Sequence, residues 1–420
     1  MSPVLLSVLS LVAAPVGCAS LREPPFLAAP PDIVWPAPPD APRVRFLGEL
    51  KSSDDVGRRG GFTHGLNALL YGRPAPDRLV TPHAVAVDAA GVRIAVADTN
   101  GGCVHLFDLE RRVYTRLDDY DAAAPAAGGG DTTVEGRRAS SHAHETLPSV
   151  DATTETPRGP MPAARWSGSE EESSVGASLP PRCPVGVAWG GDTLAIADAN
   201  QARVYLVDRS GGDAAGASPP RSFGESVLQR PSGIAFNPTC NRWYVVDAAA
   251  HAVFVFERDG RPALSFGRRG PATGEFNYPA QIAVAADGSV AVTDALNFRV
   301  QRFTADGAVL GAFGRKGDAA GDFALPKGVA IDGDGNLWVS DAHFENVQAF
   351  TPDGQLLMSL GREGAALGQF WLPAGMCIDR QDRLWIADTY NRRVQVFQLV
   401  AGRESGSQGV RERRSEGVRE

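Results

Sequence analysis

Residues 328–361, GVAIDGDGNLWVSDAHFENVQAFTPDGQLLMSLG, are the clearest copy of a unit that recurs along the chain. Short apolar runs alternate in it with turn-forming pairs such as Asp-Gly. The copy around Gln281 has the same order: IAVAA before a D-G turn, VAVTD, an alternating RVQRF, and VLGAFG. Four short strands joined by tight turns predict one four-stranded antiparallel blade per unit.

Prolines mark the start of each unit, at Pro82, Pro184, Pro231, Pro279, Pro326 and Pro373. The last four steps between them are 47 or 48 residues, and a constant period of this length is typical of propellers. The first step contains roughly 55 further residues, at about 118–178, rich in Ala, Gly, Ser, Thr and Glu. This composition predicts a disordered insertion between blades 1 and 2.

The sixth unit has only three strands and ends at RRVQVFQLV (residues 392–400). The segment PRVRFLGEL (residues 42–50) has the apolar alternation of the missing fourth strand, and pairing it there would leave no open seam. We therefore expect an all-β, six-bladed β-propeller over residues 43–400, with four-stranded antiparallel blades and a ring closed by this N-terminal strand. We expect a monomer, with a disordered charged tail at 401–420.

Two stretches carry a family resemblance: LPAGMCIDRQDRLWIADTYNRRVQVF at 372–397 and FGRKGDAAGDFALPKGVAID at 313–332. They resemble NHL repeats, and all six copies keep one register. The second strand ends in a lone Asp, which differs from the Trp-Asp of WD40 and the double glycine of kelch repeats. With WPAPPDAPRVRFLGEL at 35–50, the layout is similar to bacterial exported NHL-repeat lipoproteins, which implies a six-bladed β-propeller.

The N-terminus predicts export. Residues 4–16 are apolar but too short to span a bilayer, and small residues lead into Cys18, as in a signal peptide over residues 1–18. PVGCAS resembles a bacterial lipobox, which implies lipidation of Cys18. Because Pro15 stands where such motifs usually carry Leu, a plainly cleaved signal and a different chain start remain alternatives. We expect a Pro-rich tether at 19–42 and a periplasmic or cell-surface lipoprotein, anchored by lipid without a transmembrane helix.

Charge suggests where a partner binds. The formal net charge of −8 does not favour a nucleic-acid partner. The turns after the first and third strands share one face and contain many Asp residues, so that face is predicted to be acidic. The opposite face is predicted to be basic and to bind a protein or an anionic envelope polymer, a solvated charged rim being the alternative. The expected binding residues are Arg58, Arg59, Arg268, Arg269, Arg315, Lys316, Lys327, Arg362, Trp371 and Arg392.

An Asp ends the second strand of every unit: Asp98, Asp198, Asp247, Asp294, Asp341 and Asp388. A ring of carboxylates could hold a cation. An Asp repeated at one turn is more simply explained as a cap for the backbone N–H groups of the loop that follows. We therefore predict a structural role for these residues.

A metal-dependent enzyme is the alternative function. Peptidyl-α-hydroxyglycine α-amidating lyases resemble these repeats, which implies zinc bound by Pro-His pairs in alternate blades. Only His83 matches, because Ser232 and Lys327 occupy the equivalent positions and catalytic zinc needs about three protein ligands. We favour a non-enzymatic binding or scaffold module without a cofactor over a metal-dependent lyase or hydrolase acting in the central channel.

Five cysteines without a CxxC pair exclude a zinc-finger or RING module. Cys103 and Cys183 fall in loops on the same face of neighbouring blades. Export would permit a disulfide between them, and two free thiols are the alternative.

Overall fold

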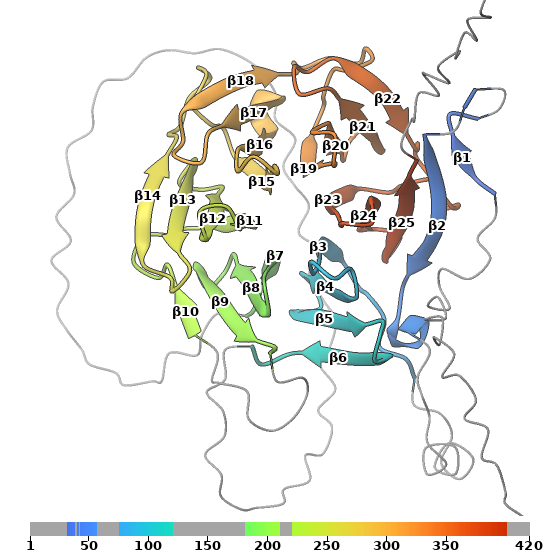
Figure 1. The fold of residues 1–420 in the computed structure, drawn as a ribbon, viewed down its shortest axis with the longest axis horizontal. Coiled ribbons are helices and arrows are strands. Elements are labelled where there is room, and N and C mark those ends of the chain that lie inside the picture. The colour runs from blue at the N-terminus through green and yellow to red at the C-terminus, as the bar shows by residue number, and fades with distance from the viewer. Residues whose placement is uncertain are drawn as a thin grey trace, which may run out of the picture. The chain divides into compact units, whose positions relative to one another are not determined.

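The computed structural model describes residues 32–37, 40–41, 43–56, 75–120, 181–210 and 221–400. These residues form six antiparallel sheets arranged in a ring (Figure 1). The predicted all-β, six-bladed propeller is confirmed. Cys18, the tail at 401–420 and most of the 118–178 insertion lie outside the described residues. Among the residues that are described, no helix reaches the length and hydrophobicity needed to cross a bilayer.

Each blade runs from an innermost to an outermost strand. Blade 1 contains β3 (Pro82–Val87), β4 (Arg93–Asp98), β5 (Cys103–Asp108) and β6 (Val113–Leu117). Blade 2 contains β7 (Pro184–Gly190), β8 (Thr193–Asp198), β9 (Arg203–Asp208) and β10 (Arg221–Phe223). Blade 3 contains β11 (Pro231–Asn237), β12 (Arg242–Asp247), β13 (Ala252–Glu257) and β14 (Pro262–Phe266).

Blade 4 contains β15 (Pro279–Val284), β16 (Val290–Asp294), β17 (Arg299–Phe303) and β18 (Val309–Phe313). Blade 5 contains β19 (Pro326–Ile331), β20 (Leu337–Asp341), β21 (Asn346–Phe350) and β22 (Leu356–Leu360). Blade 6 contains β23 (Pro373–Ile378), β24 (Arg383–Asp388), β25 (Arg393–Leu399), β2 (Val44–Leu50) and β1 (Val34–Trp35). Two short 3₁₀ segments, η2 (Ser53–Val56) and η3 (Ala295–Asn297), complete the described elements.

Apolar layers between successive blades form the core. The second strand of each blade is covered on both sides, so β24 buries every residue after Arg383. Strands covered on both sides need continuous apolar runs, which is why these segments show little alternation. Trp243 of blade 3 and Trp385 of blade 6 are the largest fully buried side chains.

Strand β2 closes the ring as predicted. It pairs antiparallel with β25, Val44 opposite Leu399 and Leu50 opposite Val394, and the two strands lie side by side in Figure 1. Phe46 is buried and meets Phe397 edge to face, with ring centroids 5.5 Å apart. N-terminal and C-terminal strands therefore complete one sheet.

Strand β1 was not predicted, because the segment before residue 43 was assigned to a tether. Val34 and Trp35 pair with Arg45 and Val44 of β2, adding a fifth strand to blade 6. The Trp35 ring packs against Phe397 at 5.6 Å. A two-residue edge strand tolerates flanking prolines because it needs backbone hydrogen bonds on one side only.

Residues up to Tyr120, at the edge of the predicted insertion, are part of the propeller. Tyr120 is buried, and its hydroxyl donates to Asp198 Oδ2 at 2.6 Å. Residues 118–120 therefore belong to the contact between blades 1 and 2, because the large aromatic ring of Tyr120 fills that layer.

Hydroxyl groups join neighbouring blades near the channel. Each donates to a backbone carbonyl at the start of the next inner strand: Thr99 to Pro184 (2.9 Å), Ser232 to Pro279 (3.3 Å), Thr293 to Lys327 (2.7 Å), Ser340 to Ala374 (2.7 Å) and Thr389 to Pro82 (2.8 Å). The last of these bonds joins blade 6 to blade 1, so the ring is sealed at its inner edge as well as its outer edge.

Candidate functional site

The loops that connect successive blades lie on the same face of the ring as the loops between second and third strands, and this face is here called the loop face. Three of the blade-to-blade loops have the same structure. They join blades 3 to 4, 4 to 5 and 5 to 6. In each loop a fully buried phenylalanine forms a parallel bridge to a residue near the loop's start; the pairs are Arg269–Phe276, Lys316–Phe323 and Glu363–Phe370. The buried ring fixes the loop to the blade beneath it.

A buried glutamine on the third strand locks each of these loops. Gln301, Gln348 and Gln395 accept from the backbone N–H of Gly274 (2.8 Å), Gly321 (2.9 Å) and Gly368 (2.9 Å). The same amides donate to the carbonyls of Glu275 (2.7 Å), Asp322 (3.0 Å) and Gln369 (2.6 Å). Both ends of each amide are used, so the loops are held in one conformation before any partner arrives.

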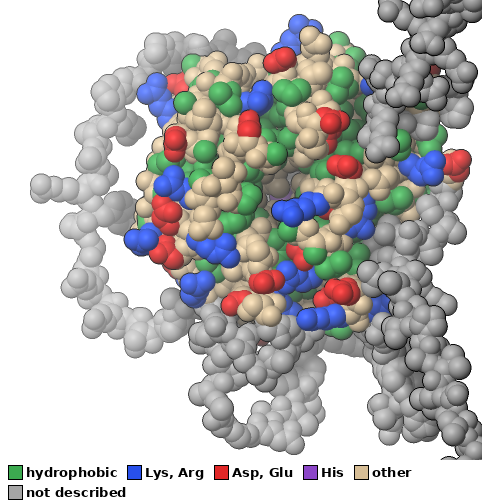
Figure 2. All heavy atoms as spheres, viewed as in Figure 1, with side chains coloured by type: hydrophobic (Ala, Val, Ile, Leu, Met, Phe, Trp, Pro, Cys, Tyr) green, Lys and Arg blue, Asp and Glu red, His purple; other side chains and the backbone are tan. Residues whose placement is uncertain are grey.

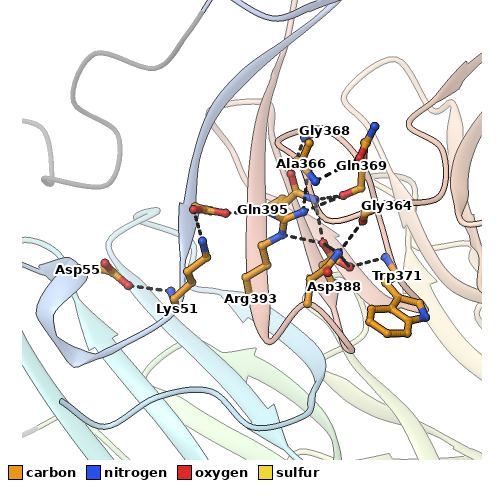
Figure 3. Close-up of polar contacts among 12 residues, drawn as sticks. Lys51, Asp55, Gly364, Ala366, Gly368, Gln369, Trp371, Asp388, Arg393 and Gln395 are labelled. Atoms are coloured by element: carbon orange, nitrogen blue, oxygen red, sulfur yellow. Dashed lines mark hydrogen bonds and ion pairs between the residues drawn. The ribbon is translucent and has the colours of Figure 1, made fainter. Parts of the chain in front are cut away.

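The repeat aspartates cap the loops, as predicted. Asp388 is fully buried and accepts from the Trp371 backbone N–H at 2.7 Å and from Arg393 Nε at 2.7 Å (Figure 3). Arg393 also donates to the carbonyls of Ala366 and Gln369, at 2.8 and 2.9 Å. This network fixes the backbone that carries Trp371.

Two aromatic side chains stand above this network. Trp371 and Tyr390 are 48% and 53% exposed, and their rings meet edge to face at 5.5 Å. The Tyr390 backbone N–H donates to the Trp371 carbonyl at 3.1 Å. In Figure 3 the Trp371 indole is directed away from the Asp388 cluster. Large, half-exposed rings on a rigid backbone can be buried by a partner at little cost in conformational entropy.

Tyr278 is a further exposed aromatic residue, which was not predicted from the sequence. It is 47% exposed, lies edge to face with His251 at 4.7 Å, and its backbone N–H donates to His251 Nδ1 at 3.1 Å. Its position directly before the marker Pro279 could have predicted that it lies on the loop face, because that position is at the loop-face end of an inner strand.

The predicted cations fall into three groups. Arg268 and Arg315 are exposed but pair with Glu275 (2.9 Å) and Asp322 (2.8 Å), so their charge is largely neutralised. Arg269, Lys316, Arg362 and Arg392 are exposed without an ion pair to another described residue; Lys316 lies over the Phe298 ring at 5.3 Å. Lys327 is half-buried beside the channel, and Arg58 and Arg59 lie outside the described residues.

Figure 2 shows one face of the ring, on which Lys, Arg, Asp and Glu side chains are interspersed around a central hollow. Some charged side chains in the turns between first and second strands pair with one another. Arg93 bonds Asp88 and Asp192, each at 2.7 Å, and Arg383 bonds Asp379 at 2.7 Å. The carboxylates in these pairs are neutralised by a neighbouring arginine. The composition of the turns alone would have counted them as free negative charges.

Residues 370–397 match the family model described as NHL repeat. This stretch begins at the buried Phe370 and runs through β23, β24 and β25, a construction that the other blades repeat. The last blade of this six-bladed β-propeller therefore contains an NHL repeat.

Known proteins similar to this NHL propeller differ widely. The E3 ubiquitin-protein ligase NHLRC1 of Rattus norvegicus is 38% identical over 72 residues, which is 17% of this chain and only 18% of the ligase. An auxiliary nutrient binding protein from Bacteroides thetaiotaomicron has a TM-score of 0.48 at 12% identity, covering 76% of this chain and 68% of that one. A catalytically inactive virginiamycin B lyase from Staphylococcus aureus has a TM-score of 0.46 at 10% identity, covering 77% and 96%.

His83, the weak metal candidate, is bonded within the propeller: its Nδ1 lies 2.8 Å from the Val185 carbonyl. The described residues contain no group of three or more His, Cys, Asp or Glu side chains placed to hold a metal. Cys103 and Cys183 are free thiols, so the disulfide considered from the sequence is not formed. Cys103 points into the core of blade 1, where it lies 3.4 Å from His105 Nε2.

Asp98 of blade 1 makes stability depend on pH. Burial raises its pKa, but hydrogen bonds from His105 and from the backbone N–H groups of Val80, Thr81 and Gly101 outweigh this effect and lower the pKa to about 2. A carboxyl whose pKa is lowered by folding stabilises the protein above its unfolded pKa of about 3.9, and this stability disappears as the pH falls through the folded pKa.

We therefore expect Asp98→Asn to unfold more easily than the wild type at pH 6, with a difference that shrinks by about 2 kcal/mol between pH 5 and pH 2. Urea denaturation at pH steps across this range measures the effect. A difference that stays constant with pH would contradict the assignment of the lowered pKa to Asp98.

Proposed function

We propose that this NHL propeller is an exported, lipid-anchored, non-enzymatic binding module whose loop face captures a protein with an acidic surface. The proposed contact region, named the loop surface, consists of Arg269, Tyr278, Lys316, Arg362, Trp371, Tyr390 and Arg392. All seven lie on or beside the connections between blades 3 and 6.

The observation that carries the proposal is the exposed Trp371–Tyr390 pair on a backbone locked by Asp388 and Gln395. A solvated rim needs neither exposed aromatic rings nor buried hydrogen bonds that fix them. Trp, Tyr and Arg supply most of the binding energy at protein interfaces, particularly when they are already ordered in the free protein.

The charge of the loop surface selects the partner. Four cations, Arg269, Lys316, Arg362 and Arg392, have no ion pair among the described residues. Carboxylates on a partner would satisfy them and speed association. The aromatic rings favour a protein over a purely polyanionic polymer, because a polymer of repeating charge would leave these rings uncovered.

Capture by the loop surface can be tested by crosslinking in intact cell envelopes. Trp371→Ala with Tyr390→Ala should reduce capture by about 30-fold or more, as expected for loss of a central aromatic contact. Arg362→Glu with Arg392→Glu should reduce capture and make what remains insensitive to salt. Arg261→Glu is the matched control, because Arg261 is 78% exposed in the β13–β14 turn on the opposite face. Equal loss in the control, or full capture by the aromatic double variant, would refute the proposed surface.

Anchoring is the part of the proposal that rests on the N-terminal segment alone. If Cys18 is lipidated, the wild type but not Cys18→Ser should incorporate labelled palmitate and sediment with membranes. Incorporation by both proteins, or by neither, would remove the anchor and leave the loop surface proposal unaffected.

A further inference from the structure

The six inner strands enclose a cavity of about 210 Å³ at the centre of the ring. Its walls come from all six inner strands, with apolar side chains at Phe236, Val284, Ile331 and Ile378 and with the Trp189 indole, whose buried Nε1 has no hydrogen-bond partner among the described residues. Of the described residues that line it, Gln281 alone carries an amide or charged side chain. A space-filling view shows the hollow at the centre of the ring (Figure 2).

Gln281 differs from the residue that most other blades have at the same position. The equivalent residues of blades 2, 3, 5 and 6 are Gly186, Gly233, Gly328 and Gly375. A Cβ atom on Gly328 would overlap the Ala374 carbonyl, and one on Gly375 would lie 2.8 Å from the His83 carbonyl, so neighbouring backbones meet at this level. Blade 4 instead places a long amide here, which close packing of the ring does not require.

The Gln281 amide is ready to bind a ligand. The residue is only 9% exposed, yet no hydrogen bond joins its side chain to another described residue. The amide lines the cavity, so a ligand with complementary atoms would bond it directly.

Lys327 lies next to Gln281. The Thr293 hydroxyl accepts from the Gln281 backbone N–H at 2.9 Å and donates to the Lys327 carbonyl at 2.7 Å. The Lys327 ammonium has no hydrogen bond or ion pair to another described residue. Burial lowers its pKa, and the positive charge of Arg230 lowers it further. Burial also lowers the pKa of His83, against a hydrogen bond to Val185, and Lys327 adds to the lowering.

The charge of Arg230 acts on Lys327 and the charge of Lys327 acts on His83, so these basic side chains lie near one another around the channel. An anion bound beside the Lys327 ammonium would be stabilised by its charge. The cavity volume exceeds the roughly 150 Å³ of an apolar cavity that accepts benzene, so an aromatic ring or a short alkyl chain fits.

We propose that the central channel binds a small organic carboxylate, with its carboxylate between Lys327 and Gln281 and its aromatic or short aliphatic body against the apolar wall. This site is separate from the loop surface, and neither proposal requires the other.

Calorimetric titration of the purified full chain with benzoate and hexanoate, compared with benzyl alcohol and 1-hexanol, tests the site. The wild type should bind each acid at least tenfold more tightly than its alcohol, because a hydrogen bond to a charged group adds about that much. Equal affinity for acid and alcohol, or no binding of either acid at millimolar concentration, would overturn the proposal.

Two variants locate the carboxylate. Lys327→Met should weaken benzoate binding tenfold or more without lowering the thermal midpoint, since it removes a half-buried cation that has no partner among the described residues. Gln281→Gly restores the residue found in four other blades and should weaken binding about fivefold. Arg261→Met is the control. Arg261 is an exposed cation in the β13–β14 turn and does not line the cavity, so this variant should bind like the wild type. Unchanged binding by Lys327→Met would exclude the site.

Discussion

Replacing Asp388 with alanine is expected to lower the free energy of unfolding by about 3–5 kcal/mol, because it leaves the buried Arg393 guanidinium without its main counter-charge. Arg393 is 2% exposed and would keep only Glu49 Oε2, at 2.9 Å, as an acidic partner. The Trp371 backbone N–H would also lose its acceptor. Urea denaturation at neutral pH measures the loss.

Blade 5 provides the matched control for this prediction. Asp341 caps the backbone N–H groups of Ala324, Leu325, His343 and Phe344, but Asn346 stands where blade 6 has Arg393. Asp341→Ala should therefore cost about 2 kcal/mol less than Asp388→Ala, and the double change Asp388→Ala with Arg393→Met should recover a similar amount. Equal losses in the two blades together with no recovery would show that the ion pair is not responsible.

Removal of residues 1–50 is expected to abolish the cooperative unfolding transition and to produce dimers or aggregates. Val44, Phe46 and Leu50 are almost fully buried, and their burial contributes roughly 5–9 kcal/mol, comparable with the whole stability of a typical domain. The truncation also exposes the edge of β25, which can then pair with another chain.

Calorimetry and light scattering would report both effects. Removal of residues 1–42 is the control, since it deletes β1 but keeps β2, and this protein should remain monomeric with a single transition. A monomeric product of the longer truncation with an unchanged transition would contradict ring closure by β2.

The architecture was predictable because each unit repeats its signals. The marker prolines, the Asp-Gly turns and the Asp that ends each second strand recur in register, so six weak patterns support one another. Closure by residues 44–50 followed from a missing fourth strand in the last blade. Strand β1 was not predictable, because two residues between prolines form no periodic pattern.

The candidate site was only partly predictable. Trp371 and Arg392 were selected because bulky and basic residues stood in loops. The pairing of Arg268 with Glu275 and of Arg315 with Asp322 depends on loops that fold back on themselves, and spacing along the chain does not reveal it. The locking role of Gln301, Gln348 and Gln395 was likewise hidden, since these residues look like ordinary members of alternating strands.

Closure by β2 also sets the order in which the protein can assemble. Glu49 and Arg393 form an ion pair although they are 344 positions apart. During synthesis, β2 leaves the ribosome long before its neighbour β25 exists, and its apolar side chains stay uncovered until the last strand is made. A strand that is translated early is thus among the last to find its neighbour in the ring, and the nascent chain is most prone to aggregate during that wait.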